Sequence, residues 1–271
     1  MRPWLSLFIV TFSLGFITSC SNSQPGSTGS AAAKTTPVAE QSPPATVVSP
    51  EPESDTPQVH DPAHPPIDCP LRKQGLNPDH LRPFDDVEKY IAFLERSDRA
   101  IWQKPDEVVA ALELTGSETV MDIGAGSGYF TFRLAQVLLL GKIIAADTEP
   151  EMVRHLHHRT MTDGLRNVEA TLIEPDDPEV PGEVDVVFIC DVLHHVPDRA
   201  LWLRRVVTRM QTGARLVLIE FKEGDLPEGP PESMKIPRDK LVQLVTDAGL
   251  VLTSERADLL PYQTFLVFRK P

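Results

Sequence analysis

Residues 120–128 read Val-Met-Asp-Ile-Gly-Ala-Gly-Ser-Gly, and the run Tyr-Phe-Thr-Phe-Arg-Leu-Ala follows at 129–135. Apolar residues around Asp122, then three closely spaced glycines, then an apolar-periodic run predict a buried strand, a tight turn and a helix start. Glycine has no Cβ, so such a turn lets a ligand approach the backbone closely. A second apolar run, 142–146, ends at Asp147. A carboxylate in that position, at the end of the next strand, is suited to holding the diol of a ribose.

The spacing of the glycines argues against two common nucleotide-binding loops. The dinucleotide fingerprint is G-x-G-x-x-G, but here Gly128 comes one residue early and Tyr129 occupies the place of the third glycine. A phosphate-binding P-loop requires a lysine, and this loop has none. The remaining interpretation is a ligand that carries a ribose but no pyrophosphate.

The pattern D-x-G-x-G-x-G, followed by an acid at the end of the next strand, resembles the class I S-adenosylmethionine-dependent methyltransferases. The resemblance implies that the glycine loop passes under the methionine part of the cofactor. It also implies that the acid on the second strand binds the ribose hydroxyls. The residues that take these cofactor-binding roles by resemblance are Asp122, Gly124, Ala125, Gly126, Gly128 and Asp147.

A second motif supports the same resemblance. The continuous apolar run 184–190 predicts a parallel strand buried on both faces, and Asp-Val-Leu-His-His-Val follows it at 191–196. This resembles the fourth motif of the small-molecule branch of the family, which includes quinone-biosynthesis methyltransferases. Asp191 is expected to order the loop near the methionine end of the cofactor. His194 or His195 is a candidate base, which methyl transfer needs only for a protonated nucleophile. A structural role for both histidines is the alternative.

An acidic segment, Glu-Pro-Asp-Asp-Pro at 174–178, follows the third predicted strand. In the resembling family, an acid at this place accepts a hydrogen bond from the adenine amino group. Asp176 and Asp177 are the predicted adenine-binding residues, with Glu174 as an alternative. A solvated, proline-rich turn is the other interpretation of the segment.

The order of the predicted elements indicates an α/β fold, because strands alternate with helices and so form a parallel sheet covered on both faces. The last two strands lack a helix between them and therefore pair antiparallel. The resemblance implies a Rossmann-like three-layer sandwich with seven strands, of which the last is antiparallel, preceded by lid helices. Trp102, Gln103 and Lys104 face either the pocket or the core. The predicted strands are 119–123, 142–147, 167–173, 184–190, 214–221, 250–256 and 262–269, and the predicted helices are 84–94, 105–115, 128–140, 149–163, 198–211 and 237–248.

The N-terminal third of the chain has a different character. An apolar stretch at 4–18 follows a short basic start; it is shorter than the roughly 20 residues that cross a bilayer and has the form of a secretory signal. The sequence Ile-Thr-Ser-Cys that ends at Cys20 resembles a bacterial lipoprotein signal, which implies lipidation of this cysteine. We therefore predict a signal peptide at 1–19, a disordered Pro/Ser-rich tether at 20–80 and a methyltransferase domain at 81–271.

These predictions place the protein at the bacterial cell envelope, lipid-anchored on the periplasmic face with the outer membrane as one destination, or in the cytoplasm if the signal is not used. The net charge of −13 and the lack of a basic stripe argue against nucleic acid as a partner, and no metal site is predicted. Two functions remain. One is a methyltransferase that uses S-adenosylmethionine on a small-molecule acceptor, and the other is a membrane-tethered binding protein with the same pocket and no transferase activity. The intact glycine loop favours the enzyme.

Overall fold

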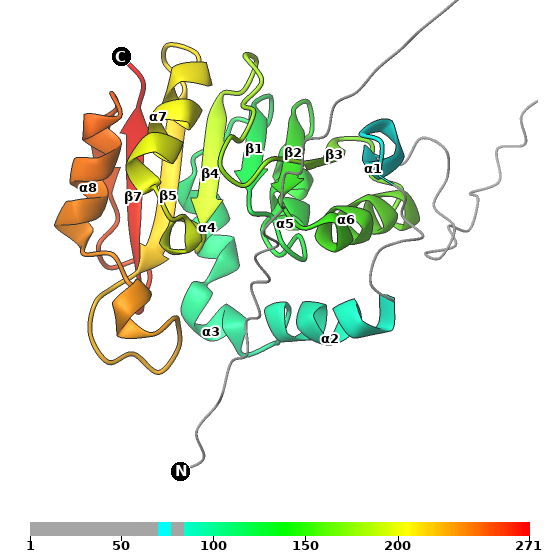
Figure 1. Ribbon diagram of the computed structural model, residues 1–271, viewed down its shortest axis with the longest axis horizontal. Coiled ribbons are helices and arrows are strands. Elements are labelled where there is room, and N and C mark those ends of the chain that lie inside the picture. The colour runs from blue at the N-terminus through cyan, green and yellow to red at the C-terminus, as the bar shows by residue number, and fades with distance from the viewer. Residues whose placement is uncertain (1–69, 77–83) are drawn as a thin grey trace, which may run out of the picture. The chain divides into compact units, whose positions relative to one another are not determined.

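The computed structural model describes residues 70–76 and 84–271 (Figure 1). The predicted signal peptide, Cys20 and most of the predicted tether lie outside the described residues. The elements, in chain order, are α1 (Pro70–Lys73), α2 (Phe84–Leu94), α3 (Arg99–Gln103), α4 (Pro105–Ala111), β1 (Thr119–Ile123), α5 (Thr131–Val137), β2 (Lys142–Asp147), α6 (Pro150–Thr162), β3 (Val168–Leu172), β4 (Val186–Cys190), the 3₁₀ turn η2 (Leu193–His195), α7 (Arg199–Arg209), β5 (Arg215–Phe221), the 3₁₀ turn η3 (Glu232–Met234), α8 (Arg238–Asp247), β6 (Val251–Glu255) and β7 (Gln263–Arg269).

The seven strands form one sheet in the order β3-β2-β1-β4-β5-β7-β6. Strands β1 to β5 are parallel to their neighbours, whereas β7 lies antiparallel between β5 and β6. This confirms the predicted Rossmann-like sheet with an antiparallel last strand. The strand order reverses between β1 and β4, and in open α/β sheets ligands bind beyond the carboxyl ends of the strands at such a switch point.

Helices cover the sheet on both sides, which makes three layers (Figure 1). Neighbouring residues of a strand point to opposite faces. Val120 of β1 therefore packs with α4 and α5, whereas Met121 packs in the cluster that contains α7 and α8. Helix α6 covers the first of these faces near β2 and β3 through Val153 and Leu156. Because both faces are buried, strands β1, β2, β4 and β5 are the mainly apolar runs from which they were predicted, whereas the edge strand β3 is only partly buried.

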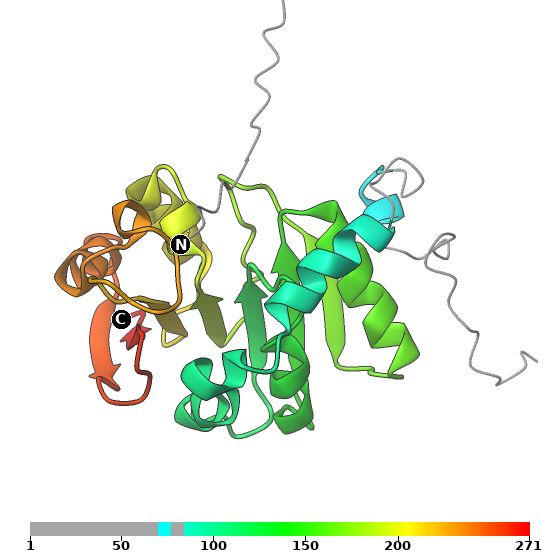
Figure 2. The same cartoon turned by 90° about the horizontal axis from the view of Figure 1, so that it is seen from below.

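Helices α2 and α3 lie across the carboxyl ends of the parallel strands (Figures 1 and 2). The apolar side of α2, with Val87 and Ile91, packs against Met152 of α6. An ion pair of 2.6 Å between Arg159 and Glu95 holds the end of α2 to α6. Helix α3, which was not predicted, is a single short turn that directly precedes α4. Helices α2 and α3 thus cover the binding edge of the sheet. The other predicted lid helix, α4, instead packs on a face of the sheet through Val108.

The folded part of the chain begins earlier than predicted. Helix α1 lies inside the segment 20–80 that was predicted as a tether, yet its Leu71 is fully buried among apolar residues of α5, α6 and β3. Gln74, directly after α1, donates from Nε2 to the carbonyl oxygen of Leu172 at 3.1 Å. One buried leucine is a weak signal in a proline-rich sequence, which explains why the periodicity did not reveal it. The described residues 70–76 therefore pack with the domain.

No helix of the described part of the chain is both long and apolar enough to cross a membrane.

Candidate active site

A cavity of about 370 Å³ lies at the switch point of the sheet. Its walls come from the loop after β1, the ends of β2 and β4, and the α2–α3 cover. The structure brings seven of the predicted site residues together here: Asp122, Gly124, Ala125, Gly126, Asp147, Asp191 and His195. Parallel strands end at one edge of a sheet, so the topology gathers side chains that lie far apart in the sequence.

The glycine loop is shaped by backbone hydrogen bonds and by Asp147. The N–H groups of Gly124 and Ala125 donate to the carbonyl oxygen of Ala146 at 2.8 and 3.0 Å. Gly126 N–H donates to Oδ2 of Asp147 at 2.8 Å. Gly124 has φ +76°, and a Cβ there would lie 2.4 Å from a methyl carbon of Val192. Side chains at this position would strain the turn, so glycine is required by both conformation and space.

Asp122 and Asp147 are buried carboxylates at the floor of the cavity. Burial, with a further contribution from the charge of Asp147, raises the pKa of Asp122 to about 7, although Thr131 Oγ1 donates to its carboxylate at 2.6 Å. Burial also raises the pKa of Asp147, and the backbone N–H groups of Glu149 and Gly126 oppose that rise. Two enclosed acids of this kind favour a ligand that brings positive charge.

The raised pKa of Asp122 fixes the sign of its effect on stability. Between the ordinary value of 3.8 and about 7, the folded state holds a proton that the unfolded chain has lost. The free energy of unfolding of the ligand-free protein therefore falls as pH rises through this window, on the order of a few kcal/mol. Thermal unfolding from pH 4.5 to 7.5 checks this: Asp122→Asn should remove much of the slope. Identical slopes in the two proteins would contradict it.

Asp191 follows β4 with φ +59°, a conformation that costs energy for residues other than glycine. Two buried glutamines hold its carboxylate: Gln263 Nε2 donates to both oxygens at 2.6 and 2.7 Å, and Gln103 Nε2 donates at 3.0 Å. Burial, then the nearby charge of Glu220, raises the pKa of Asp191 to about 6. Asp191 therefore connects the cavity to α3 and to β7.

Several residues of the site were not predicted as binding residues. Ser127 Oγ and Tyr129 OH are buried, face no hydrogen-bond partner in the described part of the chain, and belong to residues that line the cavity. Arg99 also lines it, and its guanidinium lies 4.0 Å from the centroid of the Tyr129 ring. Unsatisfied buried polar atoms in a cavity indicate a polar ligand. Arg99 is the first residue of α3, four residues beyond Glu95. It lies outside the strands and the glycine loop from which the site residues were predicted.

The two histidines differ in their surroundings. His194 is buried, and its Nδ1 lies 2.7 Å from Oε2 of Glu220, whose other oxygen accepts from the N–H of Leu193 at 2.6 Å. His195 is exposed and lines the cavity. The protein atoms around its ring partly desolvate it, and this desolvation, followed by the charge of His194, lowers the pKa of His195. Their ring centroids are 4.1 Å apart. Glu220, on β5, was not predicted and lies 26 residues from His194.

Gly128, His194 and the predicted adenine-binding acids do not line this cavity. A Cβ on Gly128 would lie 2.2 Å from a ring carbon of Phe132, so this glycine allows the turn to pack on α5. Asp176 pairs with Arg205 at 3.1 Å, and Asp177 pairs with Arg209, both on α7. The structure does not bring these two acids to the glycine loop.

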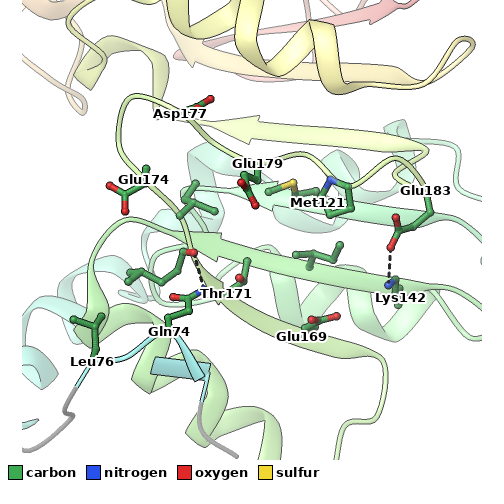
Figure 3. Close-up of a pocket in the computed structure, with 14 residues that line it drawn as sticks. Gln74, Leu76, Met121, Lys142, Glu169, Thr171, Glu174, Asp177, Glu179 and Glu183 are labelled. Carbon is green, nitrogen blue, oxygen red and sulfur yellow. Dashed lines mark hydrogen bonds and ion pairs between the residues drawn. The ribbon is translucent and has the colours of Figure 1, made fainter. Parts of the chain in front are cut away.

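Asp177 and the alternative residue Glu174 line a different cavity, of about 620 Å³ (Figure 3). It lies on the α7 side of the sheet, over β1 to β3, where β3 connects to β4 without a helix. In Figure 3 acidic side chains surround it, and the Glu183 carboxylate pairs with Lys142 at 3.3 Å. This cavity is separate from the one that contains the glycine loop, so the 174–178 segment does not complete the candidate active site.

The arrangement of β1, the glycine loop and β4 matches a known family. Residues 121–216 match the family described as "Methyltransferase domain". The match runs from β1 into β5 and includes the glycine loop, Asp147, Asp191 and both histidines. The expected class of protein is therefore supported over this stretch of the chain.

Individual relatives agree with this match. Trans-aconitate 2-methyltransferase of Rhodococcus jostii is 30% identical over 129 residues, which cover 48% of this chain and 46% of the relative. Ubiquinone biosynthesis O-methyltransferase of Xanthomonas euvesicatoria is 30% identical over 112 residues, covering 41% and 46%. The chain thus matches slightly less than half the length of these curated relatives.

The fold is shared with solved methyltransferase structures. A SAM-dependent methyltransferase from Aquifex aeolicus has a TM-score of 0.61 at 23% identity, with 69% of this chain and 98% of that chain covered. This neighbour shows the fold, and the ligand expected from the sequence is S-adenosylmethionine. The buried polar atoms of Ser127 and Tyr129, together with the acids of the cavity, fit such a ligand.

Proposed function

We propose that the protein transfers a methyl group from S-adenosylmethionine to a hydroxyl-bearing small molecule. One observation carries this proposal: the glycine loop, Asp147 and Asp191 line a single cavity at the switch point. The acceptor class rests on the relatives, whose names include an O-methyltransferase of quinone biosynthesis, and on the histidine arrangement described below.

The charges of the cavity suit this cofactor. Four carboxylates line it (Asp122, Asp147, Glu149 and Asp191), against a single arginine, Arg99. A sulfonium and an ammonium group match the excess of negative charge, and Arg99 is placed to hold the carboxylate of the methionine part. Asp147 would accept hydrogen bonds from the ribose hydroxyls, while its contacts with Gly126 and Glu149 keep the loop in shape.

When bound, the cofactor supplies an activated methyl group, so the protein mainly aligns the reactants and excludes water. The chain's own contribution to chemistry is a base for the hydroxyl proton. The Nδ1 of His194 faces Glu220. When the single proton of the neutral imidazole is on Nδ1 and is donated to Glu220, Nε2 carries no proton and can accept one. Glu220 is then a positioning residue that fixes this tautomer of the buried imidazole.

We expect Glu220→Gln to lower kcat about 100-fold while the affinity for S-adenosylmethionine changes less than threefold, since general-base catalysis contributes roughly this much. Formation of S-adenosylhomocysteine over a range of pH checks this, because the pH profile of kcat should also move when the partner of His194 changes. Glu223→Gln, two residues beyond β5 on the surface, is the matched control. Equal losses in both variants, or an unchanged pH profile, would argue for a structural role only.

The proposal as a whole is tested by calorimetric titration of S-adenosylmethionine into the purified protein. No binding at high micromolar cofactor would remove it. Binding without transfer to any hydroxyl acceptor would instead favour the tethered binding protein as the function.

We further propose that the domain is anchored to the cell envelope through Cys20. The support is the resemblance of the sequence ending at Cys20 to a lipoprotein signal and the Pro/Ser-rich composition that follows. Labelling of cells with a radioactive fatty acid should mark the wild-type protein and not the Cys20→Ala variant. Equal labelling, or none in either protein, would contradict the anchor and leave the methyltransferase proposal unaffected.

A further inference from the structure

Two polar atoms beside the cofactor cavity are buried and have no hydrogen-bond partner among the described residues. They are Nε1 of Trp102, on α3, and Oε1 of Gln263, at the start of β7. Trp102 is 8% exposed and Gln263 is fully buried. An unsatisfied buried polar group destabilises the fold, so two together indicate a place where a ligand supplies the missing partners.

The surrounding contacts hold both residues in place. The amide of Gln263 is oriented by Asp191, because its Nε2 donates to both carboxylate oxygens and the reverse orientation would set Oε1 against them. Gln263 is also the cross-strand partner of Phe221 on β5. The Trp102 ring lies 5.7 Å from the ring of Phe221. The indole and the amide therefore flank the same position at the end of β5.

This position adjoins the residues that the reaction uses. Asp191, which holds Gln263, lines the cofactor cavity. Phe221 directly follows Glu220, and its ring lies 6.5 Å from that of His194. A molecule held between Trp102 and Gln263 would thus lie between the cofactor cavity and the proposed base.

We propose that Trp102 Nε1 and Gln263 Oε1 bind the methyl acceptor, and that this acceptor is an uncharged ring compound with a hydroxyl group. The inference rests on the proposed function and adds the substrate class. The indole N–H only donates and the amide oxygen only accepts, which is the pair of partners that a hydroxyl group needs. The rings of Trp102, Phe221 and Tyr262, with Trp102 tilted by 43° and 34° relative to the other two, supply an apolar wall.

Charge argues against an anionic acceptor. Two acids adjoin the position, since Asp191 accepts from Gln263 and Glu220 directly precedes Phe221, and the charge of Glu220 disfavours ionisation of Asp191. Arg96, whose guanidinium lies 5.9 Å from the Trp102 ring, pairs with Asp98 and Glu228. Arg99 is the residue proposed for the carboxylate of the cofactor. A tricarboxylate, the acceptor named by one relative, would lack a free cation here.

The test is direct binding of a neutral and an anionic probe to the full-length protein saturated with S-adenosylhomocysteine. The probes are catechol and trans-aconitate. In protein labelled with ¹⁵N-tryptophan, the indole N–H signal of Trp102, assigned by its loss in Trp102→Phe, should move with catechol and not with trans-aconitate. The signal of Trp202, whose Nε1 already donates to the Pro175 carbonyl at 3.1 Å, should not move.

Trp102→Phe should weaken catechol binding roughly fivefold to tenfold, the loss expected for one hydrogen bond, with the affinity for S-adenosylmethionine unchanged. Trp202→Phe, a matched loss of an indole on α7, should change neither. An unmoved Trp102 signal, no catechol binding, or tighter binding of trans-aconitate would overturn the acceptor site while cofactor binding stays intact. Failure of the wild type to bind S-adenosylmethionine would instead remove the proposed function.

Discussion

Asp147→Ala is expected to weaken the binding of S-adenosylmethionine about 100-fold. The substitution removes the carboxylate proposed for the ribose, and it also frees the N–H groups of Gly126 and Glu149, which now donate to it at 2.8 and 2.9 Å. Hydrogen bonds to a charged group contribute about 1.5–3 kcal/mol each, and a loss of about 3 kcal/mol corresponds to roughly two powers of ten in the dissociation constant. Calorimetric titration measures the change.

Asp176→Ala is the control for that experiment. Its carboxylate pairs with Arg205 and lies outside the cofactor cavity, so the affinity should stay within about twofold, the range typical of surface substitutions. Equal affinity of the Asp147→Ala variant and the wild type would remove the ribose assignment alone. A loss of affinity in Asp176→Ala would support the adenine role that the sequence predicts for the 174–178 segment.

Gly128→Ala is expected to destabilise the domain by roughly 2–5 kcal/mol. Gly128 has φ +83°, and its new Cβ would lie 2.2 Å from Phe132 and 2.9 Å from Leu156. Left-handed strain costs about 1–2 kcal/mol, and overpacking of a filled core adds about 1–3 kcal/mol. Thermal unfolding should show a midpoint lower by about 10 °C.

Gly182→Ala is the matched control, because no atom lies within 4 Å of a Cβ at this position and its φ lies outside the left-handed region. Its midpoint should equal that of the wild type. Equal midpoints for Gly128→Ala and Gly182→Ala would show that α5 shifts to accept the methyl group, contrary to the packing described.

The features that could be predicted from the sequence are local in the chain. The strand, glycine turn and helix of 119–137 are encoded by neighbouring residues, and Asp147 follows at the end of the next strand. Alternation of strands and helices then fixes a parallel sheet, and the sheet brings these ends together. That is why most of the predicted cofactor-binding residues lie in one cavity.

The features that were missed depend on contacts between distant residues. Gln103 and Gln263 donate hydrogen bonds to Asp191 across 88 and 72 positions of the sequence. No periodicity in the sequence predicts hydrogen bonds between residues so far apart. Asp176 and Asp177 follow β3, in the segment to which the resemblance assigned the adenine-binding acid. Both form ion pairs with arginines one turn apart on α7. Short elements are also hard to predict, since α1 and α3 are too brief to show a helical period.

The position of β7 has a consequence for incomplete or cleaved chains. This strand lies inside the sheet, between β5 and β6, so a protein cut in the turn before Gln263 would lose the attachment of β6 as well. The full length of β5, from Arg215 to Phe221, pairs with β7 and would then present a row of unsatisfied backbone groups. Bare edges of this kind recruit other strands, so we expect such fragments to aggregate rather than persist as soluble, inactive forms.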